Sequence, residues 1–306
     1  MKKFILFVVS LWCFAQQATA QQEQAALTHY HINPHLINPA NAGLTDNHQV
    51  FLHGRNAWTG FPGGADTYAL SYDGPIGKTF GLGAIIFSDK ASYQNRFRAA
   101  VNYSFSFDVD DFNLGFGFST EFSQLKLDND VMNDPSLIDL NDGNLAAALD
   151  GSNFFGATLG FQGTYKGQTF MGIAFPNIIM ARLDETPSSG GNEQEGFYLF
   201  NFGHRFISST YGFTIEPSLL LRRAESVPFQ ADINLKGYFL EDKLIGGLSY
   251  RGGSNGALAL LVGTRFSNFS FHYSFDVSFQ QFQTYSSGAH EITLSVAFPG
   301  QRSTTN

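Results

Sequence analysis

Three polar residues near the C-terminal end of the chain are of the types that form a hydrolytic site. His272, Ser274 and Asp276 would supply a base, a nucleophile and an orienting carboxylate. Residues two apart on a strand lie about 7 Å apart on the same face, which is too far for the hydrogen bond that activates a nucleophile. The spacing therefore favours polar side chains that line an interior, and a barrel lipase is the alternative.

Two further groups of residues offer ligands for a metal ion. His29, His31 and His35 lie close together in the sequence, and we expect them in an exposed periplasmic segment without a metal. The acidic stretch 128–150 could suggest calcium, but Met132 occupies the fifth position of such a loop and Asn133 stands where an EF-hand needs glycine. The sequence thus predicts no metal, no cofactor and no enzyme.

The composition narrows the class of protein. The chain has 306 residues, of which 43% are hydrophobic, 15% aromatic and only 14% charged, whereas soluble domains average roughly 25% charged residues. The aromatic content excludes intrinsic disorder, and the net charge of -8 disfavours nucleic-acid binding. Because the mean hydropathy is only -0.10, the apolar residues must be interleaved with polar ones.

The first twenty residues have the pattern of a secretory signal peptide. Two lysines precede an apolar run at 4–14, and a small-residue cleavage site, Ala-Thr-Ala, follows at 18–20. The run is too short to cross about 30 Å of hydrocarbon as a helix, which disfavours a membrane anchor. Cys13, the one cysteine, lacks the small neighbours of a lipoprotein site. We therefore expect a mature protein with neither a disulfide nor a thiol nucleophile.

Segments of apolar–polar alternation recur through the rest of the chain. In 269–280 every odd position is aromatic or valine, while the even positions are Ser, His, Asp and Gln. Segments of about 9–11 residues suit strands that cross a bilayer at a tilt. About fourteen such segments occur, near 50–57, 66–72, 80–88, 96–107, 113–121, 153–165, 168–175, 196–206, 211–221, 228–239, 243–250, 257–265, 269–279 and 290–298. The predicted fold is all-β, a transmembrane antiparallel β-barrel of the outer membrane.

The polar positions and the connections favour this barrel over a secreted β-sandwich. The non-aromatic faces carry mostly Ser, Gly, Asn, Gln and Thr rather than the charges that a soluble sandwich needs. Tight turns alternate with connections that include three long ones, 122–152, 176–195 and 280–289. Outer-membrane barrels have short turns on the periplasmic side and long loops outside.

These patterns divide the chain into four predicted parts. They are a signal peptide at 1–20, a periplasmic N-terminal segment at 21–49 that could cap the lumen, the barrel at 50–298 and a polar tail at 299–306.

Several short motifs occur in an order that resembles a known family. HINPHLINPANAG (31–43) and RNAWTGF (55–61) begin the series, and YSSGAHEI (285–292) closes it. Between them lie YALSYDGP (68–75), GLG (81–83), FPN (175–177), PSLLL (217–221), DINL (232–235) and GLSYR (247–251). The series resembles the PorP/SprF family of type IX secretion system outer-membrane proteins, found in Bacteroidetes. The chain departs from it at Ala57 and Ala289, where the family more often has Gln and Ser.

The resemblance implies a non-enzymatic component of the type IX secretion system that supports secretion or surface attachment of cargo proteins, such as large adhesins, with a link to gliding motility. The implied partners are periplasmic ring and motor proteins, secreted cargo with a C-terminal signal, and outer-membrane lipid. The motifs suggest partner-binding or lumen-organising roles for Asn38, Pro39, Gly43, Arg55, Trp58, Tyr285, Gly288, His290 and Glu291. Ordinary barrel packing is the alternative for each residue, and a diffusion channel or hydrophobic-solute transporter is the alternative function.

Overall fold

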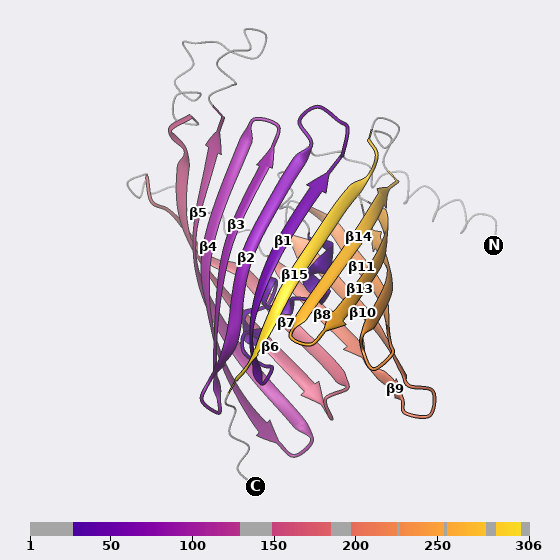
Figure 1. Cartoon of the computed structure of the whole chain (residues 1–306). Coiled ribbons are helices and arrows are strands. Elements are labelled where there is room, and N and C mark those ends of the chain that lie inside the picture. Colours follow the sequence, from indigo (N-terminus) through magenta and orange to yellow (C-terminus); the bar gives the residue numbers. More distant parts are fainter. Residues whose placement is uncertain are drawn as a thin grey trace, which may run out of the picture.

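A computed structural model describes residues 27–128, 149–184, 197–224, 227–253, 256–279 and 286–300. Almost all of them lie in long antiparallel strands (Figure 1). The strands are β1 (Asn47–Ala57), β2 (Ala65–Ile76), β3 (Phe80–Ala91), β4 (Gln94–Val109), β5 (Phe112–Leu127), β6 (Ser152–Tyr165), β7 (Thr169–Arg182), β8 (Tyr198–His204), β9 (Phe206–Ser208), β10 (Phe213–Ala224), β11 (Val227–Phe239), β12 (Leu244–Gly252), β13 (Ala257–Phe266), β14 (Phe269–Ser278) and β15 (Ala289–Pro299).

The sheet closes on itself. The last strand, β15, pairs with β1, so that Arg55 lies opposite Glu291, and β10 pairs with β11 on the far side. β8 and β9 both pair with β10 and form one strand interrupted at Arg205, so the described strands make a barrel of fourteen. Closure leaves no sheet edge with unpaired backbone groups in the lipid. The predicted all-β barrel is confirmed.

Alternate residues of each strand face lipid and lumen. On β2, Tyr68 and Leu70 are 60% and 48% exposed on the outer face, whereas Thr67 and Ser71 are 1% exposed on the inner face. Because successive side chains of a strand point to opposite faces, the sequence alternation places apolar groups against the bilayer and polar groups inside.

The connections differ at the two ends of the barrel. At the end where β1 begins and β15 finishes, the turns between strands span two to four residues. Asp110 and Lys166 take φ of 52° in two of these turns, the left-handed conformation that tight hairpins need. Residues 128–151 and 183–197 connect strands at the opposite end, called the long-loop end below.

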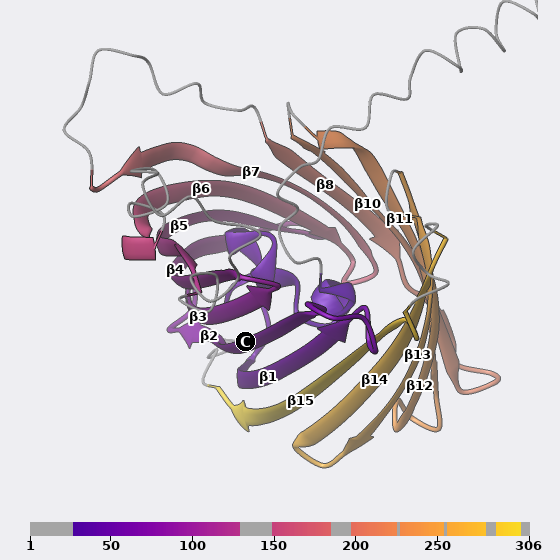
Figure 2. The ribbon, with the colours of Figure 1, turned by 90° about the horizontal axis from the view of Figure 1, so that it is seen from above.

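The lumen is not empty, because the chain before β1 lies inside it. Three short 3-10 helices, η1 (Thr28–His31), η2 (Pro34–Leu36) and η3 (Pro39–Asn41), make up this lumen segment, residues 27–44. Figure 2 shows it in indigo within the ring of strands. No described helix is long and apolar enough to span a membrane.

Candidate functional site

The lumen segment runs along the inside of the barrel. At its start, the Thr28 N–H donates to the carboxylate of Glu291, near the long-loop end of β15 (2.7 Å). At its other end, the Gly43 N–H donates to the carboxylate of Asp73, close to the short turn after β2 (3.0 Å). The segment therefore extends from the long-loop half of the lumen to the short-turn end, where it enters β1.

A buried ion cluster holds η1 against the wall. The Arg55 guanidinium donates to Asp276 (2.7 Å) and to Glu291 (2.9 Å), and also to the hydroxyl of Thr28 (3.1 Å). Glu291 accepts the backbone N–H groups of Thr28 (2.7 Å) and His29 (2.9 Å) as well. These N–H groups lie at the start of a helix, where they have no intrahelical partner. The carboxylate thus caps η1 while Arg55 balances its charge.

A second set of hydrogen bonds joins η1 and η2 to β1, β2 and β15. The Thr293 hydroxyl lies 2.7 Å from Nδ1 of both His29 and His53. The Asn33 amide donates to the Ser71 hydroxyl (2.8 Å) and lies 3.1 Å from Nε2 of His53. All five side chains are buried, so this network replaces the water that they would otherwise bind.

The opposite wall also binds the segment. Asn234 donates to the phenol oxygen of Tyr30 (2.8 Å), and Lys236 donates to the backbone oxygen of His31 (2.9 Å). The Lys236 ammonium pairs with Glu216 at 2.7 Å, so its charge is balanced within the wall. η1 is therefore held from two sides of the barrel.

The later part of the segment, around η3, packs closely against the barrel wall where strand glycines leave room for it. The Asn38 carbonyl oxygen caps η3 by accepting the Ala40 N–H (3.0 Å), and its amide donates to the Phe161 backbone oxygen (3.0 Å). Pro39 occupies the first turn of η3. A Cβ at Gly117 would collide with the backbone of Pro39 and Ala40, so a glycine at this strand position lets the helix approach.

Gly43 is also required by its conformation. Its φ is 61°, and a Cβ there would collide with the backbone of Gly74. Only glycine adopts this conformation without strain, so the residue sets the turn that leads the segment into β1.

The histidines of the lumen segment are buried, and the expectation of an exposed periplasmic position for them is wrong. His29 and His35 are 0% and 2% exposed. Asn102 donates to the His35 backbone oxygen (3.0 Å), and burial lowers the pKa of His35 to about 3. Burial also lowers the pKa of His29, although the nearby carboxylates act in the opposite direction. The segment therefore carries uncharged imidazoles at neutral pH.

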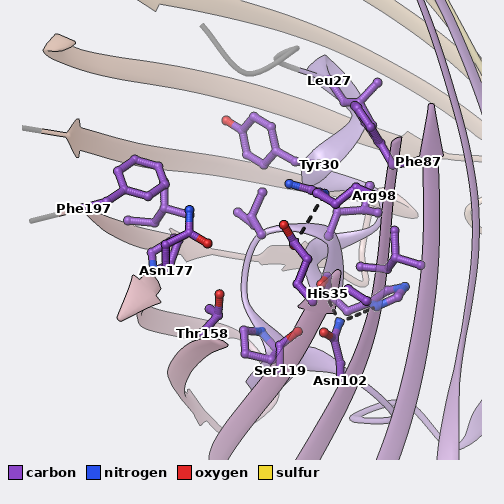
Figure 3. Close-up of a pocket in the computed structure, with 18 of the residues that line it drawn as sticks. Leu27, Tyr30, His35, Phe87, Arg98, Asn102, Ser119, Thr158, Asn177 and Phe197 are labelled. Atoms are coloured by element: carbon purple, nitrogen blue, oxygen red, sulfur yellow. Dashed lines mark hydrogen bonds and ion pairs between the residues drawn. The ribbon is translucent and has the colours of Figure 1, made fainter. Parts of the chain in front are cut away.

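One cavity lies beside the lumen segment. It has a volume of about 130 Å³ and is lined by Leu36 and Ile37 of the segment and by strand residues that include Phe87, Arg98 and Asn177 (Figure 3). The Arg98 guanidinium lies 5.0 Å from the centre of the Phe87 ring and 3.5 Å from Glu121. The lining thus combines apolar groups with a paired cation.

The remaining predicted residues that the structure describes lie at the long-loop end. Trp58 directly follows β1 in a left-handed conformation (φ 57°) and is 39% exposed. Gly288 (φ 92°) accepts the Thr59 N–H at 3.0 Å, and a Cβ there would approach the backbone oxygen of Asp276 to 2.6 Å. His290 contacts the Tyr273 hydroxyl at 2.8 Å on the β14–β15 ladder. Tyr285 lies outside the described residues.

The structure therefore brings Arg55 and Glu291 together in the cluster that holds η1. It places Asn38, Pro39 and Gly43 in the later part of the lumen segment and leaves His290 on the barrel wall. Sequence reasoning missed Thr28, His53 and Thr293 as members of the cluster. The charged residues at lumen-facing positions were the available signal of such a cluster. An unpaired charge is rarely buried, so these residues needed partners inside the barrel.

The family description "Type IX secretion system membrane protein PorP/SprF" matches residues 19–296. The chain belongs to the PorP/SprF family. This match covers the lumen segment and nearly the whole barrel. The family and the fold together make the chain an outer-membrane β-barrel of the type IX secretion system, associated with other components of that system.

No curated protein matches the chain. Among solved structures it is similar to the CymD monoaromatic hydrocarbon channel, with 11% identity and a TM-score of 0.50 over 90% of this chain and 92% of that one. The TodX deltaS2S3 mutant monoaromatic hydrocarbon channel has 11% identity and a TM-score of 0.50, with 86% and 92% covered. Omp33 of Acinetobacter baumannii has 8% identity and a TM-score of 0.49, with 83% and 99% covered. These likenesses concern the fold alone.

Proposed function

We propose that this PorP/SprF barrel is a non-enzymatic component that supports the secretion or surface attachment of cargo proteins with a C-terminal signal, such as a large adhesin, and thereby gliding. It would be exported through a signal peptide cleaved after residue 20. Many of its lumen-facing groups, such as Glu291, Asp276 and Asn234, bind the lumen segment or Arg55, so the proposal assigns partner contacts to the loops and turns. The observation that carries the proposal is the lumen segment bound across the barrel by Glu291, Asn234 and the backbone oxygen of Phe161.

The proposed mechanism is that of a fixed scaffold. Connections 128–151 and 183–197 would face outside and contact the cargo, while the short turns would face periplasmic ring and motor proteins. Extended cargo could add its main chain to an accessible strand end, which is one recurring mode of peptide recognition. Arg55 and Glu291 would act indirectly, by keeping the lumen segment in place.

Deletion of the gene in its host tests this function. The cell-surface and culture-medium proteomes of the mutant are compared with those of the parent and of a strain complemented with the wild-type gene. Loss of many C-terminal-signal proteins would identify a general secretion component, and loss of one large surface protein would identify a dedicated partner. An unchanged secretome would refute both roles.

A channel for small hydrophobic solutes is the second candidate, favoured by the cavity of about 130 Å³ beside Leu36 and Phe87. Single-channel recordings in planar bilayers separate the two functions. A steady conductance of the wild-type barrel would favour a pore and count against a lumen closed by the segment. Absence of conductance, with a pore appearing when the segment is deleted, would support the scaffold.

A further inference from the structure

A cluster of buried imidazoles and carboxylates lies in the long-loop half of the lumen, and the proposed secretion function gives its imidazoles no role. His29 comes from η1, His53 from β1 and Glu291 from β15, and each is 0% exposed. One ligand atom from each residue lies within 4.8 Å of the ligand atoms of the other two. The Thr293 hydroxyl, 2.7 Å from both rings, holds the imidazoles side by side. Three different elements thus direct metal-binding groups toward one point.

The cluster carries an excess negative charge. Arg55 is the one lysine or arginine that pairs with Asp276 and Glu291 among the ion pairs of the described residues. Lys236, which binds the backbone oxygen of His31, is matched by Glu216 at 2.7 Å. Two carboxylates and one guanidinium leave one negative charge in a buried place, and burying an unbalanced charge is costly. A bound cation would remove this cost.

Several buried polar atoms around the same point lack a hydrogen-bond partner among the described residues. They are His29 Nε2, both ring nitrogens of His31, His272 Nδ1, Ser274 Oγ and Asp276 Oδ1. The His29 ring centre lies 6.3 Å from that of His31 and 6.4 Å from that of His272. Buried polar groups are nearly always bonded, so the concentration of unpartnered nitrogens and oxygens beside His29 points to a bound species that they serve.

We propose that His29, His53 and Glu291 bind a divalent transition-metal ion of the zinc type. Two imidazoles and one carboxylate form a ligand set that zinc uses in tetrahedral sites, whereas calcium and magnesium need more oxygen ligands. With bonds of about 2.0 Å, tetrahedral ligand atoms lie about 3.3 Å apart, so binding would draw the three side chains inward. His31, His272 and Asp276 surround the ion and supply its fourth ligand or hydrogen bonds to its ligands.

The ion would connect the lumen segment to the barrel wall. His29 belongs to the segment, while His53 and Glu291 belong to strands that meet where the barrel closes. Metal binding would therefore stabilise the docked segment, because binding energy is gained only when all three elements are in place.

Metal analysis of the full barrel, purified in detergent, tests the site. The protein is stripped with EDTA, incubated with ZnCl2, passed through a desalting column and analysed by inductively coupled plasma mass spectrometry. We expect about one zinc per chain in the wild type. His53→Ala and Glu291→Gln should weaken zinc binding by more than about 100-fold, since even the loss of an outer-shell partner weakens metal sites 10–100-fold.

Matched controls exclude adventitious binding and misfolding. His48→Ala and His204→Ala remove imidazoles that bond to Tyr72 and Thr169 elsewhere in the barrel, and these variants should bind zinc as the wild type does. In the wild type itself, zinc should slow amide hydrogen exchange in residues 27–36, an effect that requires no variant to fold. Less than about 0.1 zinc per chain, or equal loss in the control variants, would overturn the proposal whatever the outcome of the secretion experiment.

Discussion

Removal of the Glu291 carboxylate should release the lumen segment while leaving the barrel intact. Glu291 accepts the N–H groups of Thr28 and His29 and pairs with Arg55 at distances of 2.7 to 2.9 Å. In Glu291→Ala, these buried donors lose their acceptor. Each hydrogen bond to a charged group contributes about 1.5–3 kcal/mol, and breaking a buried ion pair costs about 3–5 kcal/mol. Because the bonds share one carboxylate, we expect docking to weaken by about 3–5 kcal/mol in total.

Hydrogen exchange measured by mass spectrometry reads this change directly. When exchange follows the opening equilibrium of the segment, a loss of 3–5 kcal/mol corresponds to exchange that is about 10²- to 10⁴-fold faster in peptides that cover residues 27–44. Strand peptides serve as an internal reference, since the ladders of β1 and β15 do not depend on the carboxylate. The experiment is run in EDTA, so that metal binding does not contribute.

Asp111→Asn is the matched control. Asp111 is paired with Lys166 at 3.3 Å on the surface, with 56% of its side chain exposed. Surface pairs contribute little, so this variant should leave exchange in the segment unchanged. An increase of less than about threefold in the exchange rate of the segment in Glu291→Ala would refute the role of Glu291 in docking η1. An equal loss of protection in the strands would refute it as well.

Three further outcomes follow from the same contacts. Burial holds the pKa of His35 near 3, while a released imidazole titrates near 6.5, so docking should weaken as the pH falls below 6.5, as measured by exchange of residues 27–44. His35 should contribute about 1.4 kcal/mol per pH unit to this loss, and His29, whose pKa burial also lowers, should add to it. Gly117→Val should displace η3 at a cost of about 1–3 kcal/mol, seen as faster exchange there, whereas Gly163→Val should not, because its Cβ meets its neighbours at an ordinary 3.6 Å. Deletion of residues 28–41 should create a steady conductance in planar bilayers that the intact chain lacks, and equal currents from both proteins would show that the segment does not block the lumen.

The barrel could be predicted from the sequence because the alternation within each strand indicates which side chains face the lipid and which face the lumen. Alternation along 269–279 identified β14 and assigned Phe271 to the lipid and Asp276 to the lumen, and both lie as expected. This signal is local, since it depends on the two-residue period of a strand. The connection lengths likewise predicted short turns at one end of the barrel and long connections at the other, as the strand bounds have them.

The burial of the lumen segment could not be predicted from such a period. Its 3-10 turns have no period that separates a buried face from an exposed one, so His29 and His35 looked like solvated residues. Their burial depends on Glu291 and Asn102, which lie 262 and 67 residues further along the chain. Pro34 and Pro39 at the starts of η2 and η3 were the local signals of short helices, because proline favours the first helical turn. The helices could be inferred from these prolines, but their position inside the barrel could not.

The residues of this cluster lie far apart in the sequence, and these separations determine when during folding the cluster can form. Thr28 contacts Glu291 across 263 residues, and Arg55 contacts Asp276 across 221. Glu291 reaches its position only when β15 pairs with both β14 and β1, the step that closes the barrel. The carboxylate that caps η1 is therefore unavailable before closure, and the docking of η1 must follow it. Until then Arg55 and Asp276 lack the strand pairing that brings them together, so the docking of η1 by this cluster is a property of the completed barrel alone.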